Sequence, residues 1–140
     1  MKTLYTAEAL ATGAGRDGHV ATTDRRVDFD LAVPEAMGGS GDGANPEQLF
    51  AAGYAACFHS ALQLVARQRK VDIEGSSVGS EVHLGNLDGG GFGLAVTLEV
   101  ILPEVDREMA RELADRAHEV CPYSNATRGN IEVDIRVSDD

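Results

Sequence analysis

Residues 45–58 read Asn-Pro-Glu-Gln-Leu-Phe-Ala-Ala-Gly-Tyr-Ala-Ala-Cys-Phe, and they begin the longest helix that the sequence predicts. Asn45 can cap the helix, Pro46 suits its first position, and Glu47 places negative charge in its first turn. Small and apolar residues then recur at spacings of three and four. They are Leu49, Ala52, Gly53, Ala56, Cys57, Ser60, Ala61 and Leu64. We therefore expect a helix to about Gln68, with one face that another segment can approach closely.

Alternating apolar and polar residues predict strands on both sides of this helix. Three are expected before it, at residues 4–10, 19–23 and 27–33, with a glycine-rich turn at 13–18. Three are expected after it: an antiparallel pair at 78–84 and 94–102, and a last strand at 131–137. A second helix should begin at Asp106 and stop at about Cys121, because the residue before Pro122 is disfavoured in helical geometry. The order β-β-β-α-β-β-α-β predicts an α+β fold, with residues 1–140 forming a single domain.

Composition limits the classes of partner. The chain of 140 residues has 12 Lys plus Arg against 23 Asp plus Glu, a formal charge of −11. This charge opposes binding to nucleic acid, which requires clustered cations. No apolar run is expected to reach the roughly 20 residues that span a bilayer, and the start of the chain lacks the apolar stretch of a signal peptide. The expectation is a cytoplasmic protein without a membrane partner.

Cys57 and Cys121 are the only cysteines. Free cysteine is among the most frequently buried residue types, so each thiol alone is explained by a place in the core. In a reducing compartment, however, two cysteines are more often free, metal-bound or redox-active than a permanent crosslink. The residues alone leave open whether the two thiols meet. If the fold brings them together, a two-thiol redox cycle becomes the leading hypothesis.

A reactive thiol must ionise, and Cys57 lies about three helical turns from the Asn45 cap, too far for the helix N-terminus to lower its pKa much. A cation has to come from elsewhere in the chain. Arg16, in the glycine-rich turn, is a candidate because a guanidinium is always charged and can pair with a carboxylate while facing a thiolate. Glu47 is the matching carboxylate. The simpler interpretation is an exposed arginine at a hairpin tip and an ordinary glutamate in the first helical turn.

Three alternatives remain open at this point. A hydrolase or acyltransferase could pair Cys57 with one of the four histidines, His19, His59, His83 or His118, although His59 is two positions from Cys57 and so lies on another helix face. A zinc site would need four converging ligands, and no Cys-x-x-Cys spacing is present. The third alternative is a non-enzymatic acidic binding module with inert buried thiols.

Four segments resemble the organic hydroperoxide resistance proteins of the OsmC/Ohr family. They are residues 12–18 (Thr-Gly-Ala-Gly-Arg-Asp-Gly), the helix start at 45–58, the turn at 89–93 (Gly-Gly-Gly-Phe-Gly), and residues 120–130 (Val-Cys-Pro-Tyr-Ser-Asn-Ala-Thr-Arg-Gly-Asn). The likeness covers essentially the whole chain. The last segment resembles the organic hydroperoxide resistance branch more than the OsmC branch, and Ala14 stands where a glycine is often seen.

This resemblance implies a thiol peroxidase that reduces organic hydroperoxides, such as alkyl or fatty-acid hydroperoxides, to alcohols and protects against oxidative stress. It implies that Cys57 is the peroxidatic cysteine and Cys121 the resolving cysteine, while Arg16 and Glu47 hold the thiolate. A broader-specificity OsmC-type peroxidase is the nearest alternative.

The resemblance also implies an OsmC-like fold in an intertwined homodimer, with mostly antiparallel sheets and a long central helix that bears the first cysteine. It implies no bound metal or cofactor, and a dihydrolipoyl group of a lipoylated protein, or another dithiol, as external reductant. An apolar substrate pocket is expected, and we assign Leu49, Phe50 and Phe92 to it.

Overall fold

In a computed structural model that describes all 140 residues, the first three predicted strands form a small antiparallel sheet in the order β1-β2-β3. The strands are β1 (Ala9–Thr12), β2 (His19–Thr22) and β3 (Asp28–Asp30). Two short 3₁₀ helices are also present. Helix η1 (Gly15–Asp17) lies between β1 and β2, and helix η2 (Glu35–Met37) follows β3. Strand β1 is shorter than predicted. Its first residue, Ala9, pairs with Thr22, the last residue of β2, so the alternating residues from position 4 have no partner in β2. Beyond Thr22 the chain turns, with Arg25 N–H bonding to the Thr22 carbonyl. The chain's contacts divide it into two compact units, Met1–Leu49 and Phe50–Asp140.

Helix α1 (Pro46–Gln68) confirms the predicted long helix. Its start is closed by two reciprocal bonds: Gln48 N–H donates to Asn45 Oδ1 at 2.9 Å, and Asn45 N–H donates to Gln48 Oε1 at 3.2 Å. This is a capping box, in which two backbone donors that the helix cannot satisfy find side-chain acceptors. The capping prediction for Asn45 is therefore confirmed.

The face of α1 that packs into the core is not the small-residue face predicted from the spacing. The buried residues of the helix are large as well as small: Tyr54, Phe58, Ala61, Leu62, Val65 and Ala66. By contrast Ala52, Ala56, Ser60 and Leu64, which belong to the predicted small-residue face, are exposed in this chain. Burial of large apolar side chains removes more apolar surface from water, so the helix turns that side to its own core. The row of small residues is left facing outward.

Helix α1 also corrects the expectation about apolar runs. It has 23 residues and a window with mean hydropathy 1.4, so by length and composition alone it could cross a membrane. Core helices of ordinary globular proteins meet the same criterion, and 33% of that window is buried within the protein. Part of the apolar surface of α1 is thus buried in the core of the protein.

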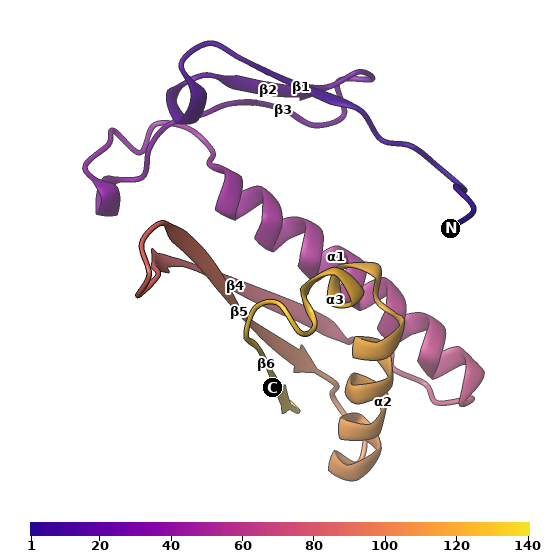
Figure 1. The fold of residues 1–140 in the computed structure, drawn as a ribbon. Coiled ribbons are helices and arrows are strands. Elements are labelled where there is room, and N and C mark those ends of the chain that lie inside the picture. Colours follow the sequence, from indigo (N-terminus) through magenta and orange to yellow (C-terminus); the bar gives the residue numbers. More distant parts are fainter. The chain divides into compact units, whose positions relative to one another are not determined.

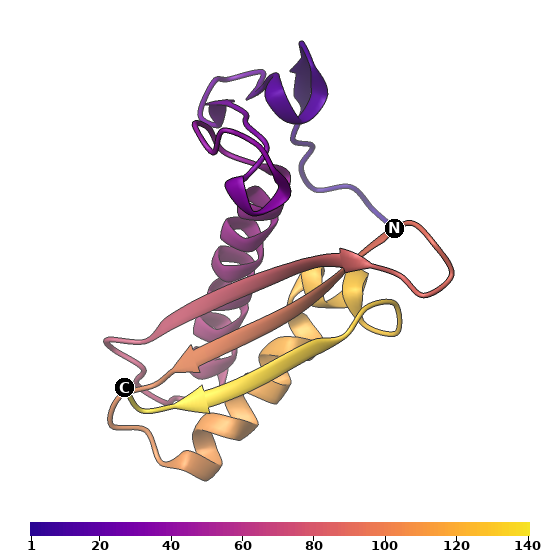
Figure 2. The same cartoon turned by 90° about the vertical axis from the view of Figure 1, so that its left-hand side faces the viewer.

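The second sheet has the order β4-β5-β6 and belongs to the Phe50–Asp140 unit. Its strands are β4 (Ser77–Asn86), β5 (Phe92–Ile101) and β6 (Val133–Ser138). The first two pair antiparallel as predicted, whereas β5 and β6 pair parallel, with Val96 opposite Val133. A parallel pair needs a crossover connection, which the following helices supply. Within this unit, α1, α2 and α3 lie on one face of the sheet (Figures 1 and 2).

The crossover contains two helices where the sequence predicted one. Helix α2 (Arg107–Val120) is capped as expected, with Met109 N–H donating to Asp106 Oδ2 at 3.3 Å. Cys121 then takes an extended conformation, with φ −61° and ψ 124°, and a short helix α3 (Pro122–Thr127) follows at once. The prediction that Pro122 stops the first helix is confirmed. The helix it starts was missed, although proline is well suited to a first helical position.

The core of this unit lies between the sheet and the helices. Its largest fully buried side chains are Tyr54, Phe58, Leu62, Val65, Val96, Leu98, Val100, Leu102, Leu113, Cys121 and Ser124. These residues come from α1, α2, α3, β5 and the adjoining connections, so the α+β prediction is confirmed. Because Cys121 is one of them, the second cysteine is held at the point where α2 ends and α3 begins.

Candidate thiol redox site

The fold brings Cys57 and Cys121 together. Their Sγ atoms are 3.4 Å apart, with Cys121 as the hydrogen-bond donor, and both cysteines are free thiols. Cys121 is completely buried, whereas Cys57, in the middle of α1, is half-buried. A disulfide requires a sulfur separation of about 2.05 Å, so a small movement joins the two atoms. The geometry suits a reversible dithiol and disulfide pair in which one sulfur is accessible and the other is protected.

The surroundings of Cys57 favour the neutral thiol. Burial raises its pKa above the ordinary value, and the Cys121 thiol adds to this rise. The backbone N–H of Tyr123 acts in the opposite direction, because it donates to the Cys57 sulfur and stabilises the charged form. Since burial is the largest of these effects, groups in the Phe50–Asp140 unit leave the thiol protonated near neutral pH. A thiolate at this position needs a cation to stabilise it.

Arg16 and Glu47 form a bidentate ion pair within the Met1–Leu49 unit. The two guanidinium nitrogens donate to the two carboxylate oxygens at 2.8 and 2.7 Å. The hydrogen bond from Arg16 lowers the pKa of Glu47, and the same bond raises the pKa of Arg16. The turn that carries Arg16 depends on glycine, because Gly15 has φ +64° and a Cβ at Gly18 would lie 2.2 Å from the Thr12 carbonyl oxygen. The pair is therefore a fixed and fully charged unit.

A group of hydroxyls lies beside the thiols in the Phe50–Asp140 unit. Tyr54 OH contacts Ser124 Oγ at 2.8 Å and Thr127 Oγ1 at 3.0 Å, and His118 Nδ1 contacts Ser124 Oγ at 2.8 Å. Burial, and then the charge of Arg128, lower the pKa of His118. The sequence predicted no role for the three hydroxyls, and for His118 only that of a possible base. Two of the hydroxyls, Ser124 and Thr127, lie in the hydroxyl-rich segment directly after Cys121, which is the signal that could have indicated them.

An apolar groove of about 1100 Å³ lies along α3. Its lining residues are Phe50, Leu87, Phe92, Gly93, Leu94, Ala95, Pro122, Tyr123, Ala126, Thr127, Asn130, Ile131 and Glu132. Two of the three residues assigned to a pocket from sequence, Phe50 and Phe92, are among them, whereas Leu49 is not. Tyr123 connects the groove to the thiols, since its ring lines the groove and its N–H bonds to Cys57.

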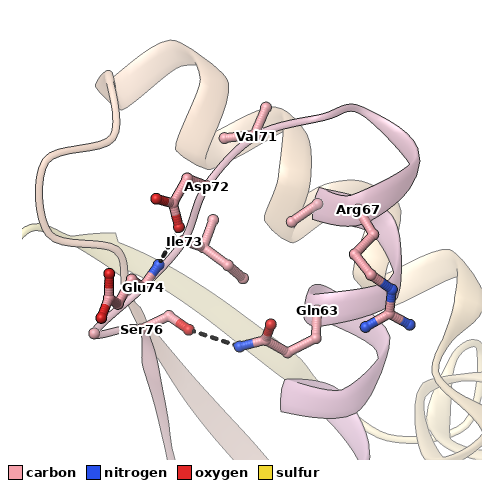
Figure 3. A pocket seen from close by; sticks show the side chains of 9 residues that line it. Gln63, Arg67, Val71, Asp72, Ile73, Glu74 and Ser76 are labelled. Carbon is pink, nitrogen blue, oxygen red and sulfur yellow. Dashed lines mark hydrogen bonds between the residues drawn. The ribbon is translucent and has the colours of Figure 1, made fainter.

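A smaller hollow of about 280 Å³ lies at the other end of α1, where the chain leaves the helix for β4. Figure 3 shows its lining side chains, with Gln63 donating to Ser76 at 3.2 Å and Glu74 N–H donating to Asp72 at 3.0 Å. His59 also contacts Ser76 Oγ, at 3.0 Å. Its polar groups mainly bond to one another, and it contains no cysteine.

The structure bears on the histidine and zinc alternatives. His59 in α1 and His118 in α2 bond to Ser76 and Ser124, and His83 contacts Thr97 at 3.3 Å. His19 bonds to two carboxylates, Asp28 at 2.6 Å and Asp30 at 2.8 Å. No three His, Cys, Asp or Glu side chains are grouped so that they could hold a metal ion. The Cys57 sulfur contacts the Cys121 thiol and the Tyr123 N–H.

These features define an α+β protein with two thiols in contact at the junction of its helices. A family model described as "OsmC-like protein" matches residues 39–136. The organic hydroperoxide resistance protein of Xanthomonas axonopodis pv. citri is 50% identical over 139 residues, which cover 98% of this chain and 96% of the relative. The organic hydroperoxide resistance protein OhrB of Bacillus subtilis is 46% identical over 134 residues, covering 96% of this chain and 98% of that one.

A crystal structure of an organic hydroperoxide resistance protein from Elizabethkingia anophelis is similar to this structure with a TM-score of 0.94 and 51% identity, covering 100% of both chains. The OsmC-like fold expected from the sequence is thus confirmed. The chain belongs to the OsmC/Ohr family.

Proposed function

We propose that this protein is a cysteine-based peroxidase that reduces organic hydroperoxides to alcohols. In the first step the Cys57 thiolate attacks the terminal oxygen of the peroxide, the O–O bond breaks, and the alkoxide takes a proton to leave as the alcohol. Cys57 is then a sulfenic acid. In the second step the Cys121 sulfur attacks the Cys57 sulfur, a disulfide forms and water leaves. A dithiol later reduces the disulfide and is itself oxidised.

The contact between the two sulfurs is the observation that carries this proposal. At 3.4 Å, the buried Cys121 thiol is placed to trap a sulfenic acid on Cys57 as soon as it forms. Rapid trapping matters because further oxidation to sulfinic acid is irreversible for most proteins. The relatives' names, which refer to organic hydroperoxide resistance, support the same activity.

The Arg16–Glu47 pair is assigned to the same chemistry. Burial raises the pKa of Cys57, so the peroxide step depends on a cation that stabilises the thiolate. The family resemblance implies that Arg16 is this cation. The bidentate bond to Glu47 supports a guanidinium held in one orientation.

The apolar groove supports a preference for peroxides with a hydrocarbon substituent. Burial of an alkyl chain contributes about 0.8 kcal/mol for each CH₂ group, a gain that hydrogen peroxide cannot obtain. Because Tyr123 both lines the groove and bonds to Cys57, a chain lying there would hold its peroxide group toward the thiol.

The remaining parts of the proposal concern partners. The external reductant is a dihydrolipoyl group or another dithiol, and the protein acts in the cytoplasm without a bound metal or cofactor. The protein is a homodimer. Outward-facing Ala52, Ala56 and Ser60 on α1 support this, together with the strongly exposed Leu4 and Tyr5, because a second copy would cover apolar surface that one chain leaves in water. Light scattering of the purified protein tests the dimer.

One experiment tests the activity. Reduced protein is mixed with cumene hydroperoxide or with hydrogen peroxide, and free thiols and intact mass are followed over time in the wild type and in Cys57→Ser. We expect both wild-type thiols to disappear, faster with the organic peroxide, and the variant to stay reduced. Equal rates with both peroxides would favour a broader OsmC-type peroxidase. If the wild-type thiols do not react, the proposed activity is wrong, and the alternative of a non-enzymatic acidic module with inert cysteines is favoured.

A further inference from the structure

Four buried or half-buried polar side chains beside the thiols take no part in the two chemical steps. Tyr54 and Ser124 are fully buried and Thr127 is 5% exposed, while His118 is half-buried. A hydroxyl placed in a core without a partner costs free energy, so such groups persist where they bond to one another in a fixed geometry. Here all four are joined by the contacts described above. The network is complete, and its members come from three helices.

These residues lie close in sequence to the two cysteines. His118 lies three residues before Cys121 and Ser124 three residues after it, and their side chains bond across the break between α2 and α3. Tyr54 lies three residues before Cys57, on the same side of α1, since residues three apart are neighbours on a helix. Its hydroxyl therefore connects the helix that bears Cys57 to the short helix that follows Cys121.

Three further contacts hold α3 in the same place. A Cβ built on Gly53 would lie 2.8 Å from the Tyr123 hydroxyl and 3.2 Å from its Cε2 atom, so the ring of Tyr123 lies directly on the bare backbone of α1. The rings of Tyr54 and Tyr123 pack with their centroids 5.7 Å apart. On the other side, Arg128 donates to the His118 carbonyl at 2.8 Å.

The proton of each group in the network can be assigned. Thr127 Oγ1 donates to the Ser124 carbonyl at 3.2 Å, which uses its one proton. Tyr54 must then donate to Thr127 Oγ1, and Ser124 must donate to Tyr54. Ser124 Oγ is left to accept from His118, which therefore carries its proton on Nδ1. Because burial lowers the pKa of His118, the ring is neutral near pH 7 and its Nε2 is unprotonated.

We propose that Tyr54, Ser124, Thr127 and His118 form a positioning network that holds Cys121 against Cys57 and so determines how fast the disulfide closes. These residues act through α3 and do not touch the peroxide. The inference rests on the proposed function for its biological meaning. The network should raise the effective concentration of the Cys121 thiol at Cys57, and this quantity can be measured without any peroxide.

The first test uses Tyr54→Phe, which removes one oxygen and keeps the aromatic ring, with Tyr5→Phe, at a tyrosine outside the network, as the matched control. Each protein is equilibrated with mixtures of reduced and oxidised glutathione, and the Cys57–Cys121 disulfide is quantified by mass. We expect the effective concentration to fall about tenfold in Tyr54→Phe, the effect of one hydrogen bond, and to be unchanged in Tyr5→Phe. Thr127→Val should behave like Tyr54→Phe and serves if that variant does not fold. Equal effective concentrations in folded wild type and variants would overturn the proposal.

The second test reads the histidine directly. Nitrogen-15 chemical shifts of His118 at pH 7 should show a neutral ring protonated on Nδ1, whereas Ser124→Ala should allow the Nε2-protonated form that predominates for histidine in water. A wild-type ring protonated on Nε2 would contradict the assigned direction of the network. A change in folding stability alone would not move this readout.

The third measurement links the network to the peroxidase cycle. After an excess of cumene hydroperoxide, Tyr54→Phe should contain more Cys57 sulfinic acid than the wild type, at an equal rate of peroxide consumption in the first turnover. If the wild-type thiols do not react with the peroxide at all, the proposed function fails, and the glutathione and nitrogen-15 results still decide the positioning role.

Discussion

The Sγ atom of Cys121 lies 3.4 Å from that of Cys57, inside the protein core, while Cys57 is the partner that remains partly accessible. In the proposed cycle, this asymmetry gives the two cysteines different roles. Peroxide would react with the partly accessible Cys57, whereas the buried Cys121 would react with the Cys57 sulfur.

The first prediction concerns Cys121→Ser. Without the resolving thiol, a sulfenic acid on Cys57 has no intramolecular partner, so we expect it to persist and then to oxidise to sulfinic acid as peroxide is added. Intact mass should show two added oxygen atoms on the variant and a loss of two hydrogens on the wild type. The same final mass for both proteins would contradict the assigned role of Cys121.

Arg16→Ala should slow the peroxide step. One unit of rise in a thiol pKa lowers the thiolate fraction near neutral pH about tenfold, so we expect the second-order rate constant with cumene hydroperoxide to fall by at least that factor. Stopped-flow measurement of thiol loss gives this constant. Arg26→Ala, at an exposed arginine of the same unit, should retain the wild-type rate. An unchanged rate in Arg16→Ala would remove this residue from the site.

The Arg16–Glu47 pair also predicts a dependence of stability on pH. The pKa of Glu47 is lower in the folded protein than in the unfolded chain, because Arg16 bonds to the charged carboxylate. Its contribution is therefore fully present above the unfolded pKa, near 4.3, and is lost as the pH falls through the folded pKa. Since Arg16 is 36% exposed, the contribution should stay below about 1 kcal/mol.

Urea unfolding of the wild type and of Glu47→Gln between pH 3 and pH 7 measures this contribution. The two curves of unfolding free energy should converge at the acidic end and separate above it. A separation that grows toward low pH would have the wrong sign for a lowered carboxylate pKa.

The sequence could predict the long helix and the two cysteine-bearing segments because their signals are local. Asn45, Pro46 and Gln48 define the start of α1 within one turn, and Pro122 defines the end of α2. The contact between Cys57 and Cys121 spans 64 positions, so no local pattern could establish it. The same holds for the bonds from Tyr54 to α3, and for the parallel pairing of β5 with β6.

The sequence could not identify which face of α1 packs into the core, for a related reason. Spacings of three and four mark more than one apolar stripe on this helix, and only the packing partners decide which stripe is buried. Large side chains such as Tyr54 and Phe58 face the core of this chain, and the small residues remain outside.

Gly53→Ala tests the close approach of Tyr123 to α1. In an open helix this substitution stabilises by about 1 kcal/mol, because glycine is the poorer helix former. Here the new methyl group would meet the Tyr123 ring, with its hydroxyl oxygen at 2.8 Å. We expect Gly53→Ala to destabilise the protein and to stabilise it when Tyr123 is also replaced by alanine. Urea unfolding of the two single variants and the double variant gives the coupling energy, and a coupling near zero would show that the ring does not depend on Gly53.

The last prediction concerns the groove. Phe92 is 71% exposed at the start of β5 and lines the groove together with Phe50. Replacing Phe92 by alanine removes apolar surface that a long alkyl chain would cover, at a position where the core does not depend on the ring. We expect KM for a fatty-acid hydroperoxide to rise several-fold, while KM for tert-butyl hydroperoxide, which is too short to reach along the groove, changes little. Each substrate thus serves as the control for the other in a single variant. An equal rise in KM for both hydroperoxides would show that Phe92 acts on the thiols themselves. An unchanged KM for both would show that the substrate chain does not bind in this groove.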